Sequence, residues 1–260
     1  MGSNKINRIG EKNINNFGSE MIIVEYNGSR DVDVYFTEYD WTAKGVRYGH
    51  FKDGGIKCPY EKTVFGMGYL GEGKYNPYEN KRATKVYATW KDMLKRCYYE
   101  KYQEKNPTYK DCKVCDEWLN FQNYGRWFEE NYYEVNGESM CLDKDILVKH
   151  NKIYSPETCI FVPQAINKLF TKSDKTRSKS VIGVHNYING KYQVSCNLIN
   201  LETGKSKQKT LGYYDTQEKA FEVYKYYKEK NIKDFADYYK NKISNKLYQS
   251  LYNYIVEIDD

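Results

Sequence analysis

The chain has 260 residues, of which 40% are hydrophobic and 29% charged, and its net charge is +6. This composition suits one to three globular domains, and no apolar run reaches the ~20 residues of a membrane-spanning helix, which argues against a membrane protein. Seven irregularly spaced cysteines favour reduced thiols over a disulfide framework. With no signal peptide recognised, we expect a cytoplasmic protein.

The positive charge is concentrated towards the C-terminus. Residues 171–260 carry 16 basic and 11 acidic side chains, a net charge of +5. A basic domain is a candidate polyanion binder, most often of nucleic acid, although a solvated lysine-rich surface explains the charge equally well.

Residues 1–75 are expected to form a small β-rich domain. Residues 1–19 are polar and predict a loosely docked arm. A hairpin is predicted over residues 21–36, with further short strands near 48–51 and 64–70. No catalytic constellation is present, so this domain is expected either to contact DNA or to dock a partner.

Two helices are predicted next, over residues 84–102 and from Asp116 onward, each with an aromatic and aliphatic stripe typical of a core-facing side. Between them, Cys112 and Cys115 form one CxxC pair. A structural zinc site needs four ligands and usually a second such pair, so we expect buried cysteines and no Zn²⁺.

Residues 142–167 combine a short apolar strand, a polar turn, a second strand and a helix. This ββα order is the plan of a small metal-dependent nuclease site. The stretch contains Leu142-Asp143-Lys144-Asp145-Ile146 and, from Tyr154, the run YSPETCIFVP followed by Asn167.

Residues 84–170 resemble a bacteriophage family related to HNH (His-Me finger) homing endonucleases. The resemblance is carried by YxxWxxMxxRCY, VCDEWxxF, LDKDI and YSPETCIFVPxxIN. It implies an HNH-like domain over residues 81–170, a bacterial host cell as the location, and Mg²⁺ or Mn²⁺ as the cofactor of an active enzyme. In such a site the metal stabilises charge on the scissile phosphate.

The resemblance assigns roles to four residues. Asp143 takes the position of the metal-binding carboxylate, and Asn167 takes that of the metal ligand on the helix. Lys144 stands where the family keeps its general-base histidine, and His150 in the following turn is the other candidate base. Lysine is protonated near neutral pH and two adjacent carboxylates favour that form, so Lys144 is better suited to clamp a phosphate than to accept a proton.

Two functions remain open at this stage. One is a homing-endonuclease-like DNA-binding protein with metal-dependent phosphodiester cleavage. The other is a catalytically inactive relative that binds a host protein or nucleic acid, as a phage regulator or a defence inhibitor.

Residues 171–180 predict a basic linker containing Arg177, which could follow a phosphate backbone or simply remain flexible. Residues 181–260 predict three short antiparallel strands and helices, with a final helix over about 232–256 that packs on the sheet or dimerises. Residues 181–230 resemble the ethylene-response-factor type of DNA-binding domain, through Gly183-Val184, Leu211-Gly212-Tyr213 and a TxxxA pattern at 216–220. The resemblance implies binding to double-stranded DNA, for which the candidate residues are Lys191, Tyr192, Lys205, Lys207, Lys209 and Arg177. The expected fold class is therefore α+β, with a β-rich N-terminal unit, a degenerate ββα centre and a C-terminal sheet with helices.

Overall fold

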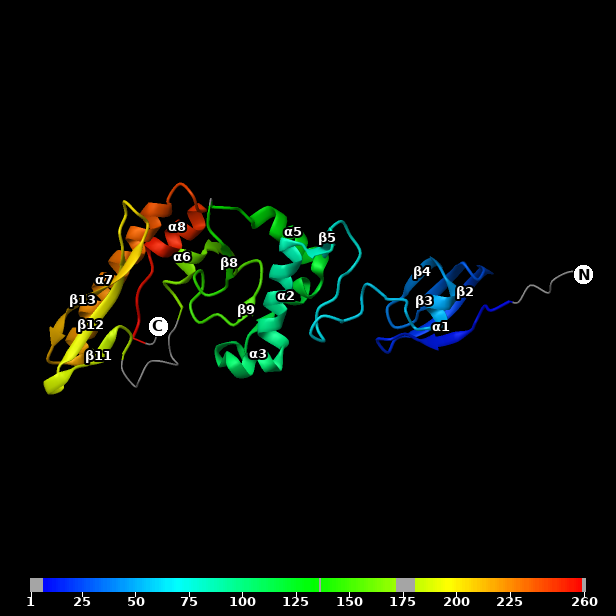
Figure 1. Cartoon of the computed structure of the whole chain (residues 1–260), viewed down its shortest axis with the longest axis horizontal. Helices are drawn as coiled ribbons and strands as arrows, with labels where there is room; N and C mark the ends of the chain where they lie inside the picture. The colour runs from blue at the N-terminus through cyan, green and yellow to red at the C-terminus, as the bar shows by residue number, and fades with distance from the viewer. Residues whose placement is uncertain (1–6, 136, 172–180, 259–260) are drawn as a thin grey trace, which may run out of the picture. The chain divides into compact units, whose positions relative to one another are not determined.

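The fold is taken from a computed structural model, which describes residues 7–135, 137–171 and 181–258. The chain is a mixed α+β protein, as expected, with 33% of residues in helices and 26% in strands. It divides into two compact units, Met1–Glu130 and Asn131–Asp260, which are described separately (Figure 1). The predicted basic linker, with Arg177, lies largely outside the described residues.

The first unit begins with a four-stranded antiparallel sheet in the order β1-β2-β3-β4. Its strands and the helix that follows are β1 (Lys12–Ile14), β2 (Glu20–Gly28), β3 (Asp31–Phe36), β4 (Trp41–Val46) and α1 (Tyr48–Lys52). Alternate residues such as Met21, Ile23 and Val34 are fully buried, which gives this sheet one core-facing side.

The second half of this unit is mainly helical. Its elements are β5 (Tyr78–Glu79), β6 (Arg82–Ala83), α2 (Lys85–Tyr98), α3 (Glu100–Lys105), the 3₁₀ turn η1 (Pro107–Tyr109), β7 (Lys113–Val114), α4 (Asp116–Leu119) and α5 (Phe121–Asn131). Thr84 caps α2 by accepting a hydrogen bond from the N–H of Tyr87. The buried indole of Trp90 donates to the carbonyl of Trp118 at 2.7 Å, which ties α2 to α4.

The second unit begins with a ββα motif. Strands β8 (Met140–Asp143) and β10 (Ile160–Pro163) are antiparallel, with Asp143 opposite Ile160. Strand β9 (Ile153–Tyr154) lies in the connection between them, and the one-turn helix α6 (Gln164–Asn167) packs against both β8 and β10.

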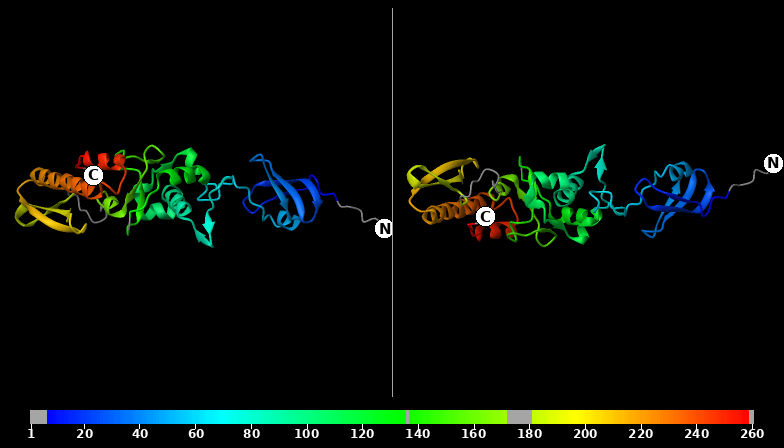
Figure 2. Two further views of the ribbon diagram at one scale, coloured as in Figure 1. Left: turned by 90° about the horizontal axis from the view of Figure 1, so that it is seen from above. Right: turned by 90° about the horizontal axis from the view of Figure 1, so that it is seen from below.

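A three-stranded antiparallel sheet follows, in the order β11-β12-β13, with α7 packed on one side of it (Figure 2). Its elements are β11 (Val184–Asn186), the 3₁₀ turn η2 (Ile188–Gly190), β12 (Tyr192–Ile199), β13 (Ser206–Tyr214), α7 (Gln217–Tyr239) and α8 (Asn245–Tyr252). Thr216 and Ser244 cap the two helices through their hydroxyls.

One apolar core serves both the ββα motif and the C-terminal sheet. Val162 and Ile166 of the motif belong to the same buried cluster as Val194 of the sheet, Ile232 of α7 and Leu251 of α8. Within residues 7–135, 137–171 and 181–258, no helix is long and apolar enough to cross a membrane.

Three local predictions were wrong. Residues 12–14, expected in a loose arm, form strand β1, and residues 48–51, expected as a strand, belong to helix α1. The final helix was expected over 232–256. Instead, α7 runs from Gln217 to Tyr239, and a separate helix, α8, begins after its cap residue Ser244. Apolar residues recur at helical spacing on both sides of residue 231, so periodicity alone could not show where one helix ends and the next begins.

Gly183 should be essential for packing in the second unit. Its φ is +71°, and a Cβ there would lie 2.0 Å from the Tyr224 ring; Gly190 has the same positive φ, at +70°, but open space around it. We expect Gly183→Ala to lower the free energy of unfolding by about 2–4 kcal/mol, the sum of backbone strain and overpacking. Gly190→Ala, the control, should cost about 1 kcal/mol from strain alone. Chemical denaturation measures both, and equal losses would contradict the packing argument.

Candidate functional site

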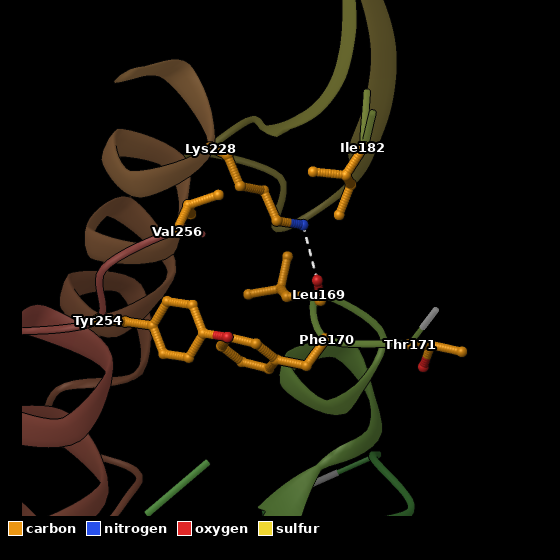
Figure 3. Close-up of a pocket in the computed structure, with 7 residues that line it drawn as sticks. All are labelled: Leu169, Phe170, Thr171, Ile182, Lys228, Tyr254 and Val256. Carbon is orange, nitrogen blue, oxygen red and sulfur yellow. Dashed lines mark hydrogen bonds between the residues drawn. The ribbon is translucent and has the colours of Figure 1, made fainter. Parts of the chain in front are cut away.

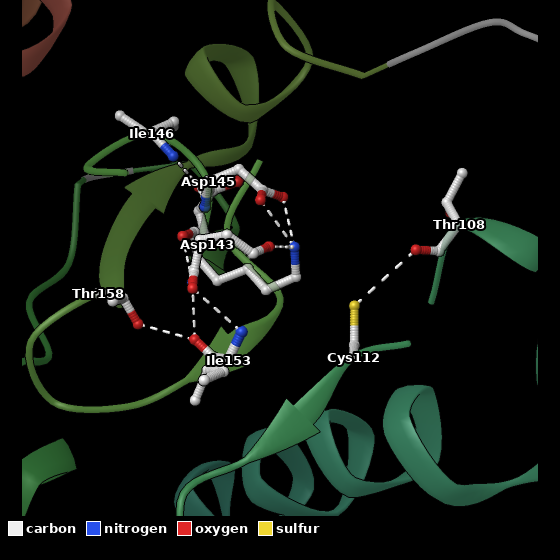
Figure 4. Close-up of polar contacts among 9 residues, drawn as sticks. Thr108, Cys112, Asp143, Asp145, Ile146, Ile153 and Thr158 are labelled. Atoms are coloured by element: carbon white, nitrogen blue, oxygen red, sulfur yellow. Dashed lines mark hydrogen bonds and ion pairs between the residues drawn. The ribbon is translucent and has the colours of Figure 1, made fainter. Parts of the chain in front are cut away.

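Strand β8 ends at Asp143, whose carboxylate is held by the main chain that follows it. Its Oδ1 accepts hydrogen bonds from the backbone N–H groups of Asp145 and Ile146, both at 2.8 Å (Figure 4). Burial raises the pKa of Asp143 because it penalises the ionised carboxylate, while the two amide hydrogen bonds oppose this effect. Asp143 therefore closes a turn at the strand end, a common use of aspartate.

Lys144, one of the two candidate bases predicted from the sequence, is buried, with 6% of its surface exposed. Its Nζ lies 2.7 Å from both carboxylate oxygens of Asp145 and 2.7 Å from the carbonyl oxygen of Asn151. The ammonium group also lies 5.9 Å from the centre of the Tyr154 ring. Its hydrogen bonds are thus made within the loop, and it does not project towards solvent as a phosphate clamp would.

Asn151 completes this arrangement from the other side of the loop. Its Nδ2 donates to the carbonyl oxygen of Lys144 at 2.9 Å and to that of Ile153 at 2.7 Å. Lys144 and Asn151 therefore bond each other reciprocally and hold the connection between β8 and β9 closed.

The other two predicted site residues are not joined to Asp143. The side chain of His150 is 53% exposed, and its Nε2 lies 3.8 Å from a carboxylate oxygen of Glu257. Asn167 ends α6, and its main-chain oxygen accepts from the N–H of Phe170. Among the described residues, no hydrogen bond links the side chains of Asp143, His150 and Asn167.

These residues do not fit a divalent metal centre. Asp145 is neutralised by Lys144, and one oxygen of Asp143 already accepts two amide hydrogen bonds. Within the described parts of the chain, no three His, Cys, Asp or Glu side chains gather closely enough to hold a metal ion. The expected use of Mg²⁺ or Mn²⁺ stays a prediction.

Cys112, one residue of the CxxC pair, donates a hydrogen bond from its thiol to the carbonyl oxygen of Thr108, with Sγ and the oxygen 3.8 Å apart (Figure 4).

A small hollow lies between the end of α6, helix α7 and the C-terminal segment. Its lining is mainly apolar and aromatic, and Lys228 donates to the carbonyl of Leu169 across it at 2.6 Å (Figure 3). Because the ammonium is bonded to the main chain, this hollow offers no free catalytic group.

The sheet face opposite α7 has a different character. Val194 and Cys196 of β12 are buried, so their neighbours Gln193, Ser195 and Asn197 point away from the core. Residues opposite one another in the register share a side, which adds His185 of β11 and three residues of β13, Gln208, Thr210 and Tyr213. We call the members of this set other than Tyr213 the outer row: His185, Gln193, Ser195, Asn197, Gln208 and Thr210.

Hydrogen bonds connect the outer row across all three strands. The Ser195 hydroxyl lies 3.3 Å from Nε2 of His185 and accepts from Nε2 of Gln208 at 3.1 Å. Gln193 donates to the hydroxyl of Thr210 at 3.4 Å. The rings of Tyr187 and Tyr213 pack 4.5 Å apart at one end of the same face. This surface was missed from the sequence, although the alternation Gln193, Ser195, Asn197 was its signal.

A bulge in β13 determines which side chains belong to the outer row. Val194 pairs with Gly212 but Ser195 pairs with Thr210, so Leu211 is the extra residue. The extra residue places Gln208 and Thr210 on the outer face.

The predicted DNA-binding residues lie around this face and not on it. Lys207 and Lys209 are opposite Leu198 and Cys196, on the helix side of the edge strand, where they are exposed. Lys205 is exposed in the turn before β13. Tyr192 is opposite Tyr214 and packs against the core, whereas Lys191 lies 3.3 Å from Asp215. Their role in DNA binding stays a prediction.

Comparison with protein-family models, with curated proteins and with solved structures finds no match.

Asp143 provides a test of its structural role. Asp143→Asn keeps an oxygen acceptor for both amides and removes the charge that burial disfavours, so the free energy of unfolding at pH 7 should stay the same or rise. Asp143→Ala leaves both amides unpaired and should cost about 1–3 kcal/mol.

The pH dependence follows from the raised pKa. The folded protein binds this proton more tightly than the unfolded chain, so stability should fall as pH rises from the ordinary aspartate range through the folded-state pKa and then level off. Asp143→Asn should remove this contribution in denaturation curves recorded across pH. If Asn destabilised as much as Ala, and Mg²⁺ stabilised the wild type alone, Asp143 would instead be a metal ligand.

Proposed function

We propose that this protein binds double-stranded DNA through the outer face of the β11-β12-β13 sheet, and that its ββα motif is an inactive scaffold. The outer row carries the proposal, because it is a continuous hydrogen-bonding surface of neutral side chains whose described side-chain partners are mainly one another.

The chemistry of the row suits base edges. Glutamine and asparagine can donate and accept in one bidentate contact with adenine, and serine or threonine can bond either kind of edge. A β-ribbon also fits the width of the major groove. The row has no arginine, so contacts to adenine are favoured over bidentate contacts to guanine.

Lysines of the edge strand β13 and of the turn before it, although not on the outer row, supply the complementary electrostatic attraction. Lys205, Lys207 and Lys209 are exposed, and no carboxylate lies within ion-pair distance of them among the described residues. Such lysines contact phosphates without reading sequence, and their contribution weakens as salt rises.

The closed loop of the ββα motif supports the inactive alternative. A general base must accept a proton, and the residue at that position is a buried ammonium bonded to Asp145 and to the Asn151 carbonyl. An inactive relative that binds DNA accounts for both the motif and the sheet.

Binding is tested by fluorescence anisotropy with labelled duplex DNA of mixed sequence at increasing salt. The wild type should bind with an affinity that falls linearly against salt on logarithmic axes. Gln193→Ala combined with Gln208→Ala should weaken binding to the best sequence by about 10-fold or more, since each good base contact is worth about 1–3 kcal/mol. Gln249→Ala, an exposed glutamine on α8, is the control and should have no effect.

Absence of DNA binding at low salt would overturn the proposal and favour a host protein as the partner.

Catalytic inactivity is tested separately with plasmid and linear DNA in the presence of Mg²⁺ or Mn²⁺. We expect no cleavage by the wild type. Metal-dependent cleavage that disappeared in Asp143→Ala and Asn167→Ala would instead establish a nuclease.

A further inference from the structure

The lysines towards the C-terminal end of α7 differ in ion pairing from those in its middle. Lys225 lies 3.6 Å from Glu229 and bonds the carbonyl of Val256, and Lys230 lies 3.1 Å from Asp234. Lys233 and Lys240, by contrast, have no carboxylate within ion-pair distance among the described residues. Neither of these two ammonium groups is therefore neutralised by a direct ion pair.

These two lysines lie over aromatic rings of α8. Nζ of Lys233 is 5.4 Å from the centre of the Tyr252 ring, and Nζ of Lys240 is 5.6 Å from that of Tyr248. The two rings are stacked on each other, 5.6 Å apart and 25° from parallel. We call these four residues the lysine–tyrosine array: Lys233, Lys240, Tyr248 and Tyr252.

The array keeps its charge while restricting its motion. An ammonium group over a tyrosine ring is attracted by the ring quadrupole, which holds it in place without neutralising it. Holding a lysine side chain in place in advance lowers the entropy lost when it binds an anion. Lys240 is the C-cap residue of α7 and keeps helical backbone angles, so it lies on the same side as Lys233, seven residues and about 10 Å further along the axis.

Two acidic residues of α7 lie one turn from Lys233, of which Glu229 is paired with Lys225 and Asp237 is not in an ion pair among the described residues. Asp237 is one turn from both lysines on α7, and it accepts a hydrogen bond from the Tyr248 hydroxyl at 2.9 Å. This contact raises the pKa of Tyr248, because it stabilises the protonated hydroxyl. Asp237 thus positions Tyr248 but also opposes any anion that approaches the array.

From this geometry we propose that the lysine–tyrosine array is a second contact surface for the phosphate backbone of duplex DNA. A separation of about 10 Å spans about three base-pair steps of 3.4 Å along one strand, so two lysines can each meet a phosphate. The array belongs to the helix layer, on the opposite side of the sheet from the outer row. One straight duplex cannot lie on both surfaces, so the array would contact a bent or second segment.

This inference rests on the proposed function only in taking DNA as the ligand, and its failure can be recognised separately. The full-length protein is titrated with labelled duplex DNA at several salt concentrations. Lys233→Gln and Lys240→Gln should each reduce the slope of log affinity against log salt by about 1, and together by about 2. Lys233→Arg should keep the wild-type slope, because arginine keeps the charge and stacks on tyrosine.

Lys230→Gln is the matched control, since it removes the same charge from the same helix at a lysine that is paired with Asp234. It should leave the slope close to the wild-type value. Asp237→Asn should strengthen binding by a few-fold, because it removes an opposing charge beside the array.

Three outcomes would overturn the inference. If the slope changed equally in Lys233→Gln and Lys230→Gln, the net charge of the protein and not the array would determine the salt dependence. That result would leave the proposed DNA binding by the outer row standing. If a polyglutamate peptide displaced DNA as well as unlabelled duplex did in the wild type, and less well in Lys233→Gln, the array would be a site for acidic protein. Absence of any DNA binding by the wild type would overturn both proposals.

Discussion

Helix α7 joins four separate segments of the second unit, and the arrangement of that unit depends on it. Its Lys228 bonds the carbonyl at the end of α6, and its Asn231 accepts from the N–H of Ile199 at the end of β12 at 2.7 Å. Glu229 accepts from the N–H of Val256, and Tyr239 donates to Glu138 at 2.6 Å. These polar contacts surround the buried apolar stripe of α7. Residues of the ββα motif and of the sheet belong to the same buried cluster as this stripe, so they share one core.

This shared core changes how the ββα motif can be understood. A nuclease centre requires groups that remain available to water, metal and phosphate. Here the carboxylate of Asp143 supports a turn, and the ammonium of Lys144 is bonded inside the loop by Asp145 and Asn151. The polar side chains of Asp143, Lys144 and Asn151 thus each have a structural role in the loop that follows β8.

The fold class followed from the sequence because hydrophobic periodicity and turn residues are local signals. Three short strands were predicted after residue 181 and are β11, β12 and β13, and the aromatic and aliphatic stripe over residues 84–102 predicted the helix that begins as α2. Strand β1 was missed because three mainly polar residues carry no period, and pairing with Ile22 and Met21 stabilises them as a strand.

The site was less predictable because it depends on pairing register and on loop contacts. Motif positions identified Asp143 and Lys144, yet nothing in their spacing shows that Lys144 turns inward to Asn151. Similarly, the charges of Lys207 and Lys209 suggested the DNA-facing residues, whereas the register places their neutral neighbours on the outer face.

The extra residue in β13 has a further consequence for that face. If Leu211 paired regularly with Ser195 instead of being the extra residue, side chains from Ser206 to Thr210 would exchange sides, because a shift of one residue reverses the direction of every side chain in a strand. Lys207 and Lys209 would then replace Gln208 and Thr210 on the outer surface. A single backbone irregularity therefore decides whether this strand presents neutral hydrogen-bonding side chains or lysines on the face opposite α7.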